Sequence, residues 1–455
     1  MVGIRSLGIK IPPQYLDKIL KIKTIMKNFQ LRTMLNFVFF NTFLLCSFSV
    51  FASNEYTLVI DGYDWGPNVS KVILHLDATD TLVDFKNFTV GVDRSSDCVT
   101  IPDAQKSGNR TVVYAYISDA QGKRIKFGNY ATLVLAVAPN QPLGSPIQYS
   151  MGGKCRGNNW IDYKVTVTNT KTNAVWNKEK SRIRPILDDF DLSGKYEYEA
   201  GKTMSYGYFK PKNKNPKAPL IIWLHGGGEG GTDPSIAIIG NKVINYASDD
   251  IQAYFGGAYV LAPQCPGAWM HNKEGVMQPG SSEDVYNVGL MALIKDFVNK
   301  HPDIDKKRIY VGGCSNGGYM SLKLLLKDPN YFAAAYISAL AYQSQYITDA
   351  QMNSIKNVPI WFIQSKDDKT TVPDVTVVPV YERLKKAGAK NVHFTFYDHV
   401  TDITGFYGGE NYYYNGHWSW IYSHANLAKL DYDGTPVKLN GRAVTLMEWM
   451  AAQTK

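Results

Sequence analysis

The stretch of this sequence that decides the fold is Arg308-Ile-Tyr-Val-Gly-Gly-Cys-Ser-Asn-Gly-Gly-Tyr-Met-Ser-Leu-Lys-Leu-Leu-Leu326. Its first four residues are typical of a buried strand, and the residues from Gly318 onward are typical of a helix. Between them, Gly313-Cys-Ser-Asn-Gly317 matches the pattern G-x-S-x-G. Glycines at these positions let the backbone make a sharp strand-to-helix turn that exposes the serine hydroxyl. The stretch therefore predicts a nucleophile elbow with Ser315 at its tip. The alternative is an ordinary glycine-rich turn.

Apolar runs alternate with helical stretches on both sides of this turn. The expected strands are Leu220–Leu224, Ala258–Leu261, Arg308–Val311, Ala333–Ile337, Pro359–Ile363 and Val392–Phe396. Continuous apolar runs of this length are expected for strands that are covered on both faces. The alternation predicts an α/β domain with a mostly parallel sheet over residues 187–455.

One of the expected helices carries its own start signal. Ser281-Ser-Glu-Asp284 matches a capping box, and apolar residues follow it at helical spacing. These residues are Val285, Val288, Met291 and Ile294. The pattern predicts that the helix opens at the capping box and carries these four side chains.

Residues 54–180 show a different pattern, with short runs of β-branched and aromatic residues separated by turn sequences. The expected strands are Tyr56–Ile60, Lys71–Leu76, Thr111–Ile117, Tyr130–Val137 and Asp162–Thr168. Regular short strands without intervening helices predict a small β-sandwich of the immunoglobulin-like type. The polar stretch around Asn169–Asp189 is expected to be a linker to the second domain.

The N-terminal region has the pattern that is typical of a secretory signal peptide. Of the 455 residues, the first 52 contain seven Lys/Arg and one acid, Asp17, and the apolar run Met34–Ala52 follows. Val50 and Ala52 fit the small-residue rule for cleavage after Ala52. We therefore expect a secreted or periplasmic protein without stable membrane association after cleavage. The alternative is an uncleaved membrane anchor.

The net charge of +9 is concentrated in this leader. Without its seven bases and one acid, the 49 Lys+Arg and 40 Asp+Glu of the chain become 42 and 39, a net charge of +3. A basic surface that would bind nucleic acid is therefore not expected. The composition, with 45% hydrophobic and 20% charged residues, also excludes a mainly disordered chain.

Four cysteines remain after the leader. An exported chain permits two disulfides. Pairing Cys98 with Cys155 and Cys265 with Cys314 would keep one disulfide within each domain. Four buried thiols are the alternative. No cysteine or histidine spacing suggests a metal site, so we expect no metal.

A glycine-rich segment, Leu224-His-Gly-Gly-Gly-Glu229, directly follows the first buried strand of the second domain. A serine hydrolase stabilises the oxyanion with one backbone amide from such a loop and another from the residue after the nucleophile. Gly227 is the expected loop donor, with Gly228 as a second candidate, and Asn316 supplies the other amide. His225 is expected to pack beneath the loop rather than to act as a base.

A serine nucleophile also needs a base, and the base needs an acid that orients it. The acid is expected after the strand Pro359–Ile363, where Asp368 is preferred over Asp367. The base is expected after the last strand, and His417 is preferred because Gly416 and Trp418 flank it. His399 and His424 are the alternatives to His417. The order Ser315, Asp368, His417 is the order found in α/β-hydrolases.

These combined stretches resemble a known group. The sequence is similar to secreted esterases of the α/β-hydrolase fold that carry an N-terminal immunoglobulin-like domain. More loosely, it resembles prolyl-oligopeptidase-like and polyhydroxybutyrate-depolymerase-like hydrolases. The matching stretches are Trp223–Gly231, Ala262–Pro266 with Trp269, Gly312–Met320, Trp361–Pro373 and Gly416–Tyr422. The resemblance implies a Ser-Asp-His carboxylesterase that needs no cofactor. Lys369 departs from the pattern as an extra residue after the acid, which keeps Asp367 open.

Aromatic residues crowd the expected site. They are Trp269, Tyr412, Tyr413, Tyr414, Trp418 and Trp420. We expect Trp269 and Trp418 to line a substrate pocket, while core packing is the alternative for most of the six. The expected substrates are small or carbohydrate-linked carboxylic esters, including acetyl and feruloyl esters. A serine peptidase and a non-catalytic carbohydrate-binding or adhesion protein are the alternative functions, and assembly into a homo-oligomer stays open.

Overall fold

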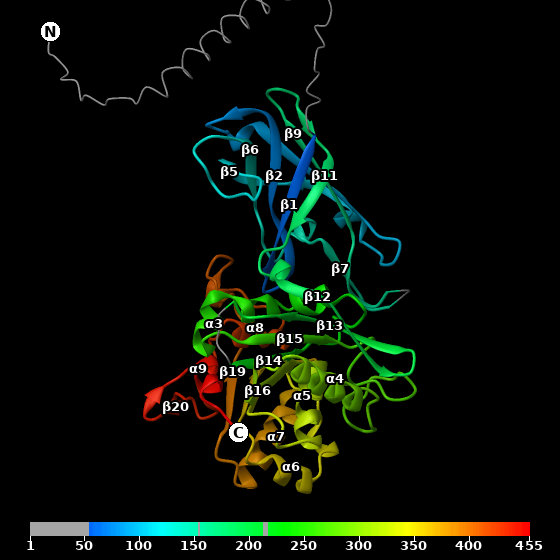
Figure 1. Ribbon diagram of the computed structural model, residues 1–455, viewed down its shortest axis with the longest axis vertical. Coiled ribbons are helices and arrows are strands. Elements are labelled where there is room, and N and C mark those ends of the chain that lie inside the picture. Colours follow the sequence, from blue (N-terminus) through cyan, green and yellow to red (C-terminus); the bar gives the residue numbers. More distant parts are fainter. Residues whose placement is uncertain (1–53, 153–154, 213–216) are drawn as a thin grey trace, which may run out of the picture. The chain divides into compact units, whose positions relative to one another are not determined.

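The second domain is built on one large sheet (Figure 1). The computed structural model describes residues 54–152, 155–212 and 217–455. The strand order is β12-β13-β15-β14-β16-β17-β18-β19. The strands are β12 (Phe190–Glu199), β13 (Lys202–Phe209), β14 (Ala218–Leu224), β15 (Tyr259–Gln264), β16 (Ile304–Cys314), β17 (Ala334–Ser338), β18 (Ile360–Ser365) and β19 (Val392–Tyr397). Strand β13 pairs antiparallel with both β12 and β15. All the other neighbouring strands of the sheet, from β15 through β14 to β19, pair in parallel. The predicted α/β domain is confirmed.

Helices lie between most of these strands and after the last one. They are α2 (Pro234–Ile239), α3 (Asp249–Phe255), α4 (Asn287–Lys300), α5 (Asn316–Lys327), α6 (Asp349–Ile355), α7 (Val377–Lys386), α8 (Trp420–His424) and α9 (Leu446–Ala451). Two separate cores lie against the sheet. In β14, for example, Ile221 and Trp223 belong to one core, whereas Leu220, Ile222 and Leu224 belong to the other. Burial on both faces explains why this strand is an uninterrupted apolar run.

Helix α4 begins later than its expected capping box. Asp284 accepts hydrogen bonds from the backbone N–H groups of Tyr286 and Asn287, so the helix starts at Asn287. Glu283 does not close a capping box but pairs with Lys323. Of the four apolar residues at helical spacing, Val285 and Val288 are exposed. The predicted start was wrong, because the acidic side chains bond to the first turn and to α5 instead.

The first domain is all-β. One sheet has the order β11-β1-β2-β6-β5, and a second has the order β10-β9-β3-β4. The strands are β1 (Glu55–Tyr63), β2 (Gly66–Asp80), β3 (Phe88–Ser95), β4 (Ser107–Arg110), β5 (Val112–Ser118), β6 (Gly128–Leu135), β9 (Asp162–Asn169), β10 (Val175–Trp176) and β11 (Lys178–Ile183). A separate hairpin joins β7 (Ile147–Ser150) to β8 (Gly157–Trp160). The side chains between the two sheets form a core that includes Leu58, Val72, Val90 and Val165.

The stretch 169–189 is not a simple linker. Strand β10 pairs with β9, and β11 pairs in parallel with β1, so the middle of this stretch completes the sandwich. The prediction of a linker there was wrong because the paired strands are polar on their exposed sides and lack an apolar period.

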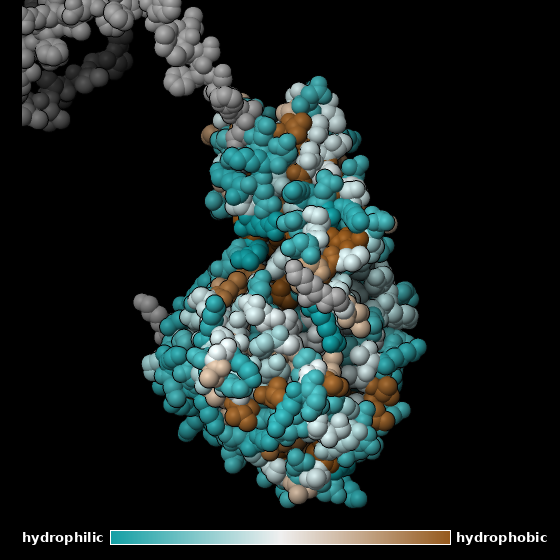
Figure 2. All heavy atoms as spheres, turned by 90° about the vertical axis from the view of Figure 1, so that its right-hand side faces the viewer, coloured by the Kyte–Doolittle hydropathy of each residue, from teal (hydrophilic) through white to brown (hydrophobic). Residues whose placement is uncertain are grey.

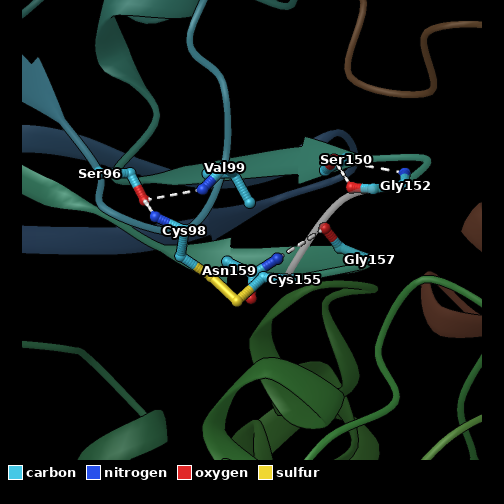
Figure 3. Close-up of a disulfide and its surroundings, with 8 residues drawn as sticks. All are labelled: Ser96, Cys98, Val99, Ser150, Gly152, Cys155, Gly157 and Asn159. Carbon is cyan, nitrogen blue, oxygen red and sulfur yellow. Dashed lines mark hydrogen bonds between the residues drawn. A yellow bond between two sulfur atoms is a disulfide. The ribbon is translucent and has the colours of Figure 1, made fainter.

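One disulfide, Cys98–Cys155, is present within the first domain (Figure 3). The expected second disulfide is absent from the described residues, since Cys265 and Cys314 are free and buried. Cys314 belongs to the same core as Trp223, and Cys265 belongs to the other core, so the two thiols pack in different cores. The predicted leader, residues 1–52, lies outside the described residues. Within the described part, no helix is long and apolar enough to cross a membrane.

Residues 52–455 cluster as a single unit, and direct contacts join the two domains within it. Lys242 forms an ion pair of 2.8 Å with Asp64, whose side chain is almost fully buried. The indole N–H of Trp160 donates to the Ser235 hydroxyl at 2.8 Å. The face drawn in Figure 2 is mostly hydrophilic, and its apolar residues form separate small groups. Most large apolar side chains are used inside the domains and where they meet.

Candidate active site

Ser315 lies at the turn between β16 and α5, and its backbone is strained. Its φ of 54° and ψ of −114° lie in a region that residues with a side chain rarely adopt. The flanking glycines are required by close packing. A Cβ on Gly313 would lie 2.6 Å from the backbone oxygen of Leu224, and a Cβ on Gly317 would lie 1.9 Å from the same oxygen. The turn therefore has the geometry expected of a nucleophile elbow.

His417 and Asp368 are hydrogen-bonded to each other. Asp368 follows β18, and His417 lies in the short 3₁₀ turn Gly416–Trp418 after β19. The imidazole Nδ1–H donates to Asp368 Oδ2 at 2.9 Å. In the neutral imidazole this bond places the single proton on Nδ1, so Nε2 is the nitrogen that can act as a base. Both His417 and Ser315 line the same cavity.

Asp368 is held by several donors besides the histidine. Its Oδ1 accepts from the backbone N–H groups of Thr370 and Thr371 at 2.8 and 3.0 Å. Its Oδ2 accepts from the Thr371 hydroxyl and the Gln364 amide at 2.7 and 2.8 Å. Burial by itself raises the pKa of this carboxyl, but the hydrogen bonds from His417 and Thr371 outweigh burial and lower it. Asp368 is therefore ionised and fixed in orientation.

The neighbouring Asp367 makes a different set of contacts. Its Oδ2 accepts from His399 Nδ1 at 2.8 Å, and its Oδ1 lies 2.6 Å from the Ser365 hydroxyl. The same hydroxyl lies 2.7 Å from the backbone oxygen of Gly416. The structure thus pairs the two acids with two different histidines, of which His417 lines the cavity and His399 does not. Asp367 therefore supports the segment that carries His417.

The other alternative base, His424, is fully buried. Its Nδ1 lies 2.6 Å from the Tyr246 hydroxyl, and burial lowers the pKa of its imidazole to about 3. His225 is likewise buried, as expected, beneath the glycine-rich loop. Its Nδ1–H donates to the backbone oxygen of Gly226, and its Nε2 accepts from the backbone N–H of Cys265 at 3.0 Å. Burial lowers the pKa of His225 to about 4, so this ring is neutral.

The two expected oxyanion donors lie next to each other. A Cβ placed on Gly227 would lie 4.0 Å from the Cβ of Asn316. Asn316 is the first residue of α5, so its backbone N–H is one of the N–H groups that have no partner within the helix. Gly226, Gly227, Asn316 and Ser315 all line the cavity. The loop and the helix N-terminus therefore face the same space as the serine.

The cavity has a volume of about 880 Å³ and is lined from both domains. Its apolar lining residues include Trp65, Ile147, Met151, Met270, Met277, Val372, Val375, Trp418 and Trp420. Trp418 is thus a lining residue, as expected. Trp269 is not, because it is fully buried and packs against the His225 ring at 5.1 Å. Tyr412, Tyr413 and Tyr414 do not line the cavity either.

Two features of the site were not predicted from the sequence. Glu229 is buried, and burial raises the pKa of its carboxyl to about 7 despite hydrogen bonds from Asn158 and the backbone of Gly226. Asn158 belongs to the β7–β8 hairpin, which had not been expected at all. In the sequence, the only indication of a role for Glu229 was its position directly after three glycines. The polar sequence Gly157–Trp160 gives no signal for a strand.

The assembled groups are those that acyl transfer requires. They comprise a hydroxyl on a strained turn, an imidazole oriented by a carboxylate, and backbone N–H groups from a loop and a helix N-terminus. Within the described residues, no cluster of three His, Cys, Asp or Glu side chains is arranged to hold a metal ion.

Comparison with protein families finds two matches. The profile of the esterase Ig-like N-terminal domain matches residues 55–181. The profile of the prolyl oligopeptidase family matches residues 288–349, which include the Ser315 turn.

Similar proteins are found among curated sequences and solved structures. The chain is 25% identical over 213 residues to dipeptidyl peptidase family member 2 of Caenorhabditis elegans, covering 44% of this chain and 24% of the relative. It is 26% identical over 169 residues to a poly(3-hydroxybutyrate) depolymerase of Ralstonia pickettii, covering 36% and 32%. The match thus spans a quarter to a third of the length of these relatives. A thermostable esterase of known structure superposes with a TM-score of 0.69 at 23% identity, over 88% of this chain and 99% of the other.

Proposed function

Because this chain combines an immunoglobulin-like N-terminal domain of the esterase type with an α/β-hydrolase domain, we propose that it is a secreted serine carboxylesterase. The observation that carries the proposal is the strained Ser315, which lines the same cavity as His417, whose imidazole is hydrogen-bonded to Asp368. The disulfide Cys98–Cys155 supports export, since disulfides persist in oxidising compartments.

In the proposed reaction, Ser315 attacks the ester carbonyl and forms an acyl-enzyme. His417 takes the hydroxyl proton at Nε2 and then gives it to the leaving alcohol. Asp368 keeps the imidazole in the required tautomer and stabilises its protonated form. The backbone N–H groups of Gly227 and Asn316 hold the negative oxygen. A water molecule then hydrolyses the acyl-enzyme by the same steps in reverse order.

The cavity favours esters with a sizeable apolar or aromatic part. Its volume of about 880 Å³ is large for an acetyl group alone, and tryptophan and methionine side chains supply much of its lining. Aromatic rings also stack well on sugar faces and on feruloyl groups. We therefore propose small or carbohydrate-linked carboxylic esters as substrates.

The test is hydrolysis of p-nitrophenyl esters of increasing acyl length, followed by feruloyl and acetylated sugars. The wild-type chain should hydrolyse at least one of these esters. Ser315→Ala should abolish turnover, whereas Ser354→Ala, a control at an exposed position on α6, should not change it. Equal rates for the wild type and Ser315→Ala would contradict the proposal. Polysaccharide binding without turnover would favour the non-catalytic alternative.

A serine peptidase is the second candidate. It is favoured by the match of residues 288–349 to the prolyl oligopeptidase family. The same triad can cleave amides, whose leaving group is poorer, so the two functions differ in the ratio of rates. Faster turnover of peptide p-nitroanilides than of the matching p-nitrophenyl esters would favour the peptidase.

A further inference from the structure

The β7–β8 hairpin of the first domain reaches the proposed active site of the second. Ile147, Tyr149, Met151, Arg156 and Asn158, from the hairpin and its connecting loop, line the cavity together with Ser315. Strand pairing aligns Tyr149 with Asn158, so both lie on the same rung of the hairpin. The hairpin therefore forms one wall of the cavity.

Asn158 makes two hydrogen bonds to the glycine-rich loop. Its backbone N–H donates to the backbone oxygen of Gly228 at 2.6 Å. Its side-chain Nδ2–H donates to Glu229 Oε1 at 2.8 Å. One residue of the first domain thus bonds both to the loop backbone and to the buried carboxyl that ends the loop.

Glu229 connects this contact to the expected oxyanion donors. Its carboxyl also accepts a hydrogen bond from the backbone N–H of Gly226, and its backbone oxygen accepts from the Gln264 amide at 2.9 Å. Gly227 lies between the two residues that these bonds fix, Gly226 and Gly228. The direction of the Gly227 N–H therefore depends on the contacts of its neighbours.

The hairpin is itself fixed at both strands. Figure 3 shows the disulfide that ties Cys155, just before β8, to Cys98. The buried guanidinium of Arg94 donates to the backbone oxygen of Ile147 at the start of β7. Gly157 permits the close approach, because its φ is +90° and a Cβ there would lie 2.5 Å from the backbone oxygen of Gly228. Both strands of the hairpin are thus held in place by contacts within the first domain.

We propose that Asn158 is a positioning residue of the proposed active site, which holds the oxyanion loop of the second domain through Gly228 and Glu229. The inference rests on the proposed esterase function. It assigns the immunoglobulin-like domain a part in catalysis, because the orientation of a backbone donor decides how well it stabilises the oxyanion. Asn158 contacts the loop and does not have to contact the reacting atoms.

The test compares three variants of the full chain with a p-nitrophenyl ester. Asn158→Ala should lower kcat about 10-fold to 100-fold and leave KM nearly unchanged, since a misaligned oxyanion donor affects the transition state more than the bound ester. Trp160→Phe removes another hydrogen bond between the domains, to Ser235, and should leave kcat unchanged. Asn159→Ala removes a neighbouring amide that donates to the backbone oxygen of Gly157 within the hairpin, and it should also leave kcat unchanged.

Hydrogen exchange of the Gly226–Gly228 amides provides a second readout that does not depend on activity. These amides should exchange faster in Asn158→Ala than in the wild type or in Trp160→Phe. An unchanged kcat with unchanged exchange would overturn the proposal, as would a loss of equal size in Trp160→Phe. A rise in KM alone would also overturn it, since it would make Asn158 a substrate contact. If the wild type matches Ser315→Ala, the esterase function itself fails and the positioning role with it.

Discussion

Glu229→Gln is expected to make the protein more stable at alkaline pH. The carboxyl is buried under the glycine-rich loop, and burial raises its pKa from 4.5 to about 7. One pKa unit corresponds to about 1.4 kcal/mol, so the rise corresponds to about 3 kcal/mol. This free energy is the cost of holding a charged carboxylate inside the protein.

The sign of the effect follows from which state binds the proton. Below pH 4.5, Glu229 is protonated in both the folded and the unfolded chain and contributes no difference. Between pH 4.5 and about 7, the unfolded chain releases the proton and the folded chain keeps it. The free energy of unfolding therefore falls as the pH rises through this window, and it stays lower by about 3 kcal/mol above pH 7. A glutamine at this position carries no such cost.

The assay is urea unfolding, followed by tryptophan fluorescence, at pH 4 and pH 8. The free energy of unfolding of Glu229→Gln relative to the wild type should be higher at pH 8 than at pH 4 by about 3 kcal/mol. Glu410→Gln, at an exposed position, is the matched control and should show no such change with pH. A difference that is the same at both pH values would refute the assignment of Glu229 as a buried carboxyl with a raised pKa.

Three further predictions concern the acid, the disulfide and the elbow. Asp368→Asn should lower kcat by about 10⁴-fold because the imidazole loses its oriented tautomer, whereas Asp367→Asn should lower it far less; ester turnover measures both, and equal losses would contradict the assignment. Replacing Cys98 and Cys155 together by serine should lower the free energy of unfolding by about 4 kcal/mol, because the bridge closes a separation of 57 residues; an unchanged urea midpoint would refute this. Gly317→Ala places a methyl group 1.9 Å from a backbone oxygen of β14 and should lower the melting temperature sharply, so a variant as stable as the wild type would contradict the elbow geometry.

The sheet of the second domain was predictable because its strands are buried on both faces. Each buried strand leaves a continuous apolar run in the sequence, as in Leu220–Leu224. The turn at Ser315 was predictable for a different reason. Its two glycines are required by contacts below 3 Å with the backbone of β14, so the pattern reports a steric need. In both cases a local sequence feature reflects a contact that the fold cannot do without.

The ends of the helices and the polar strands could not be predicted in this way. Strands β8 and β11 carry mostly polar residues and are held by backbone pairing to β7 and β1, which the sequence does not encode locally. Helix α4 begins after its expected start because Asp284 and Glu283 have other partners. Such errors come from tertiary contacts that override a local pattern.

The candidate site was predictable in its residue types but not in its support. The chain order suggested Ser315, Asp368 and His417, and the structure pairs the last two and places Ser315 in the cavity that His417 lines. The choice between Asp367 and Asp368 depended on loop geometry, because the sequence does not show in which direction each of two adjacent side chains points. Whether Trp269 lines the pocket depended on its burial in the fold, which the sequence does not show for an aromatic residue. The contact of Asn158 with Glu229 joins residues that are 71 positions apart.

The most direct measurement of the central claim is covalent labelling by a fluorophosphonate probe, with the labelled peptide identified by mass spectrometry. The account predicts that the probe modifies Ser315, that His417→Ala greatly slows the labelling, and that Ser315→Ala prevents it. A protein that is not labelled, or that is labelled equally fast without His417 or at a different serine, would contradict the account.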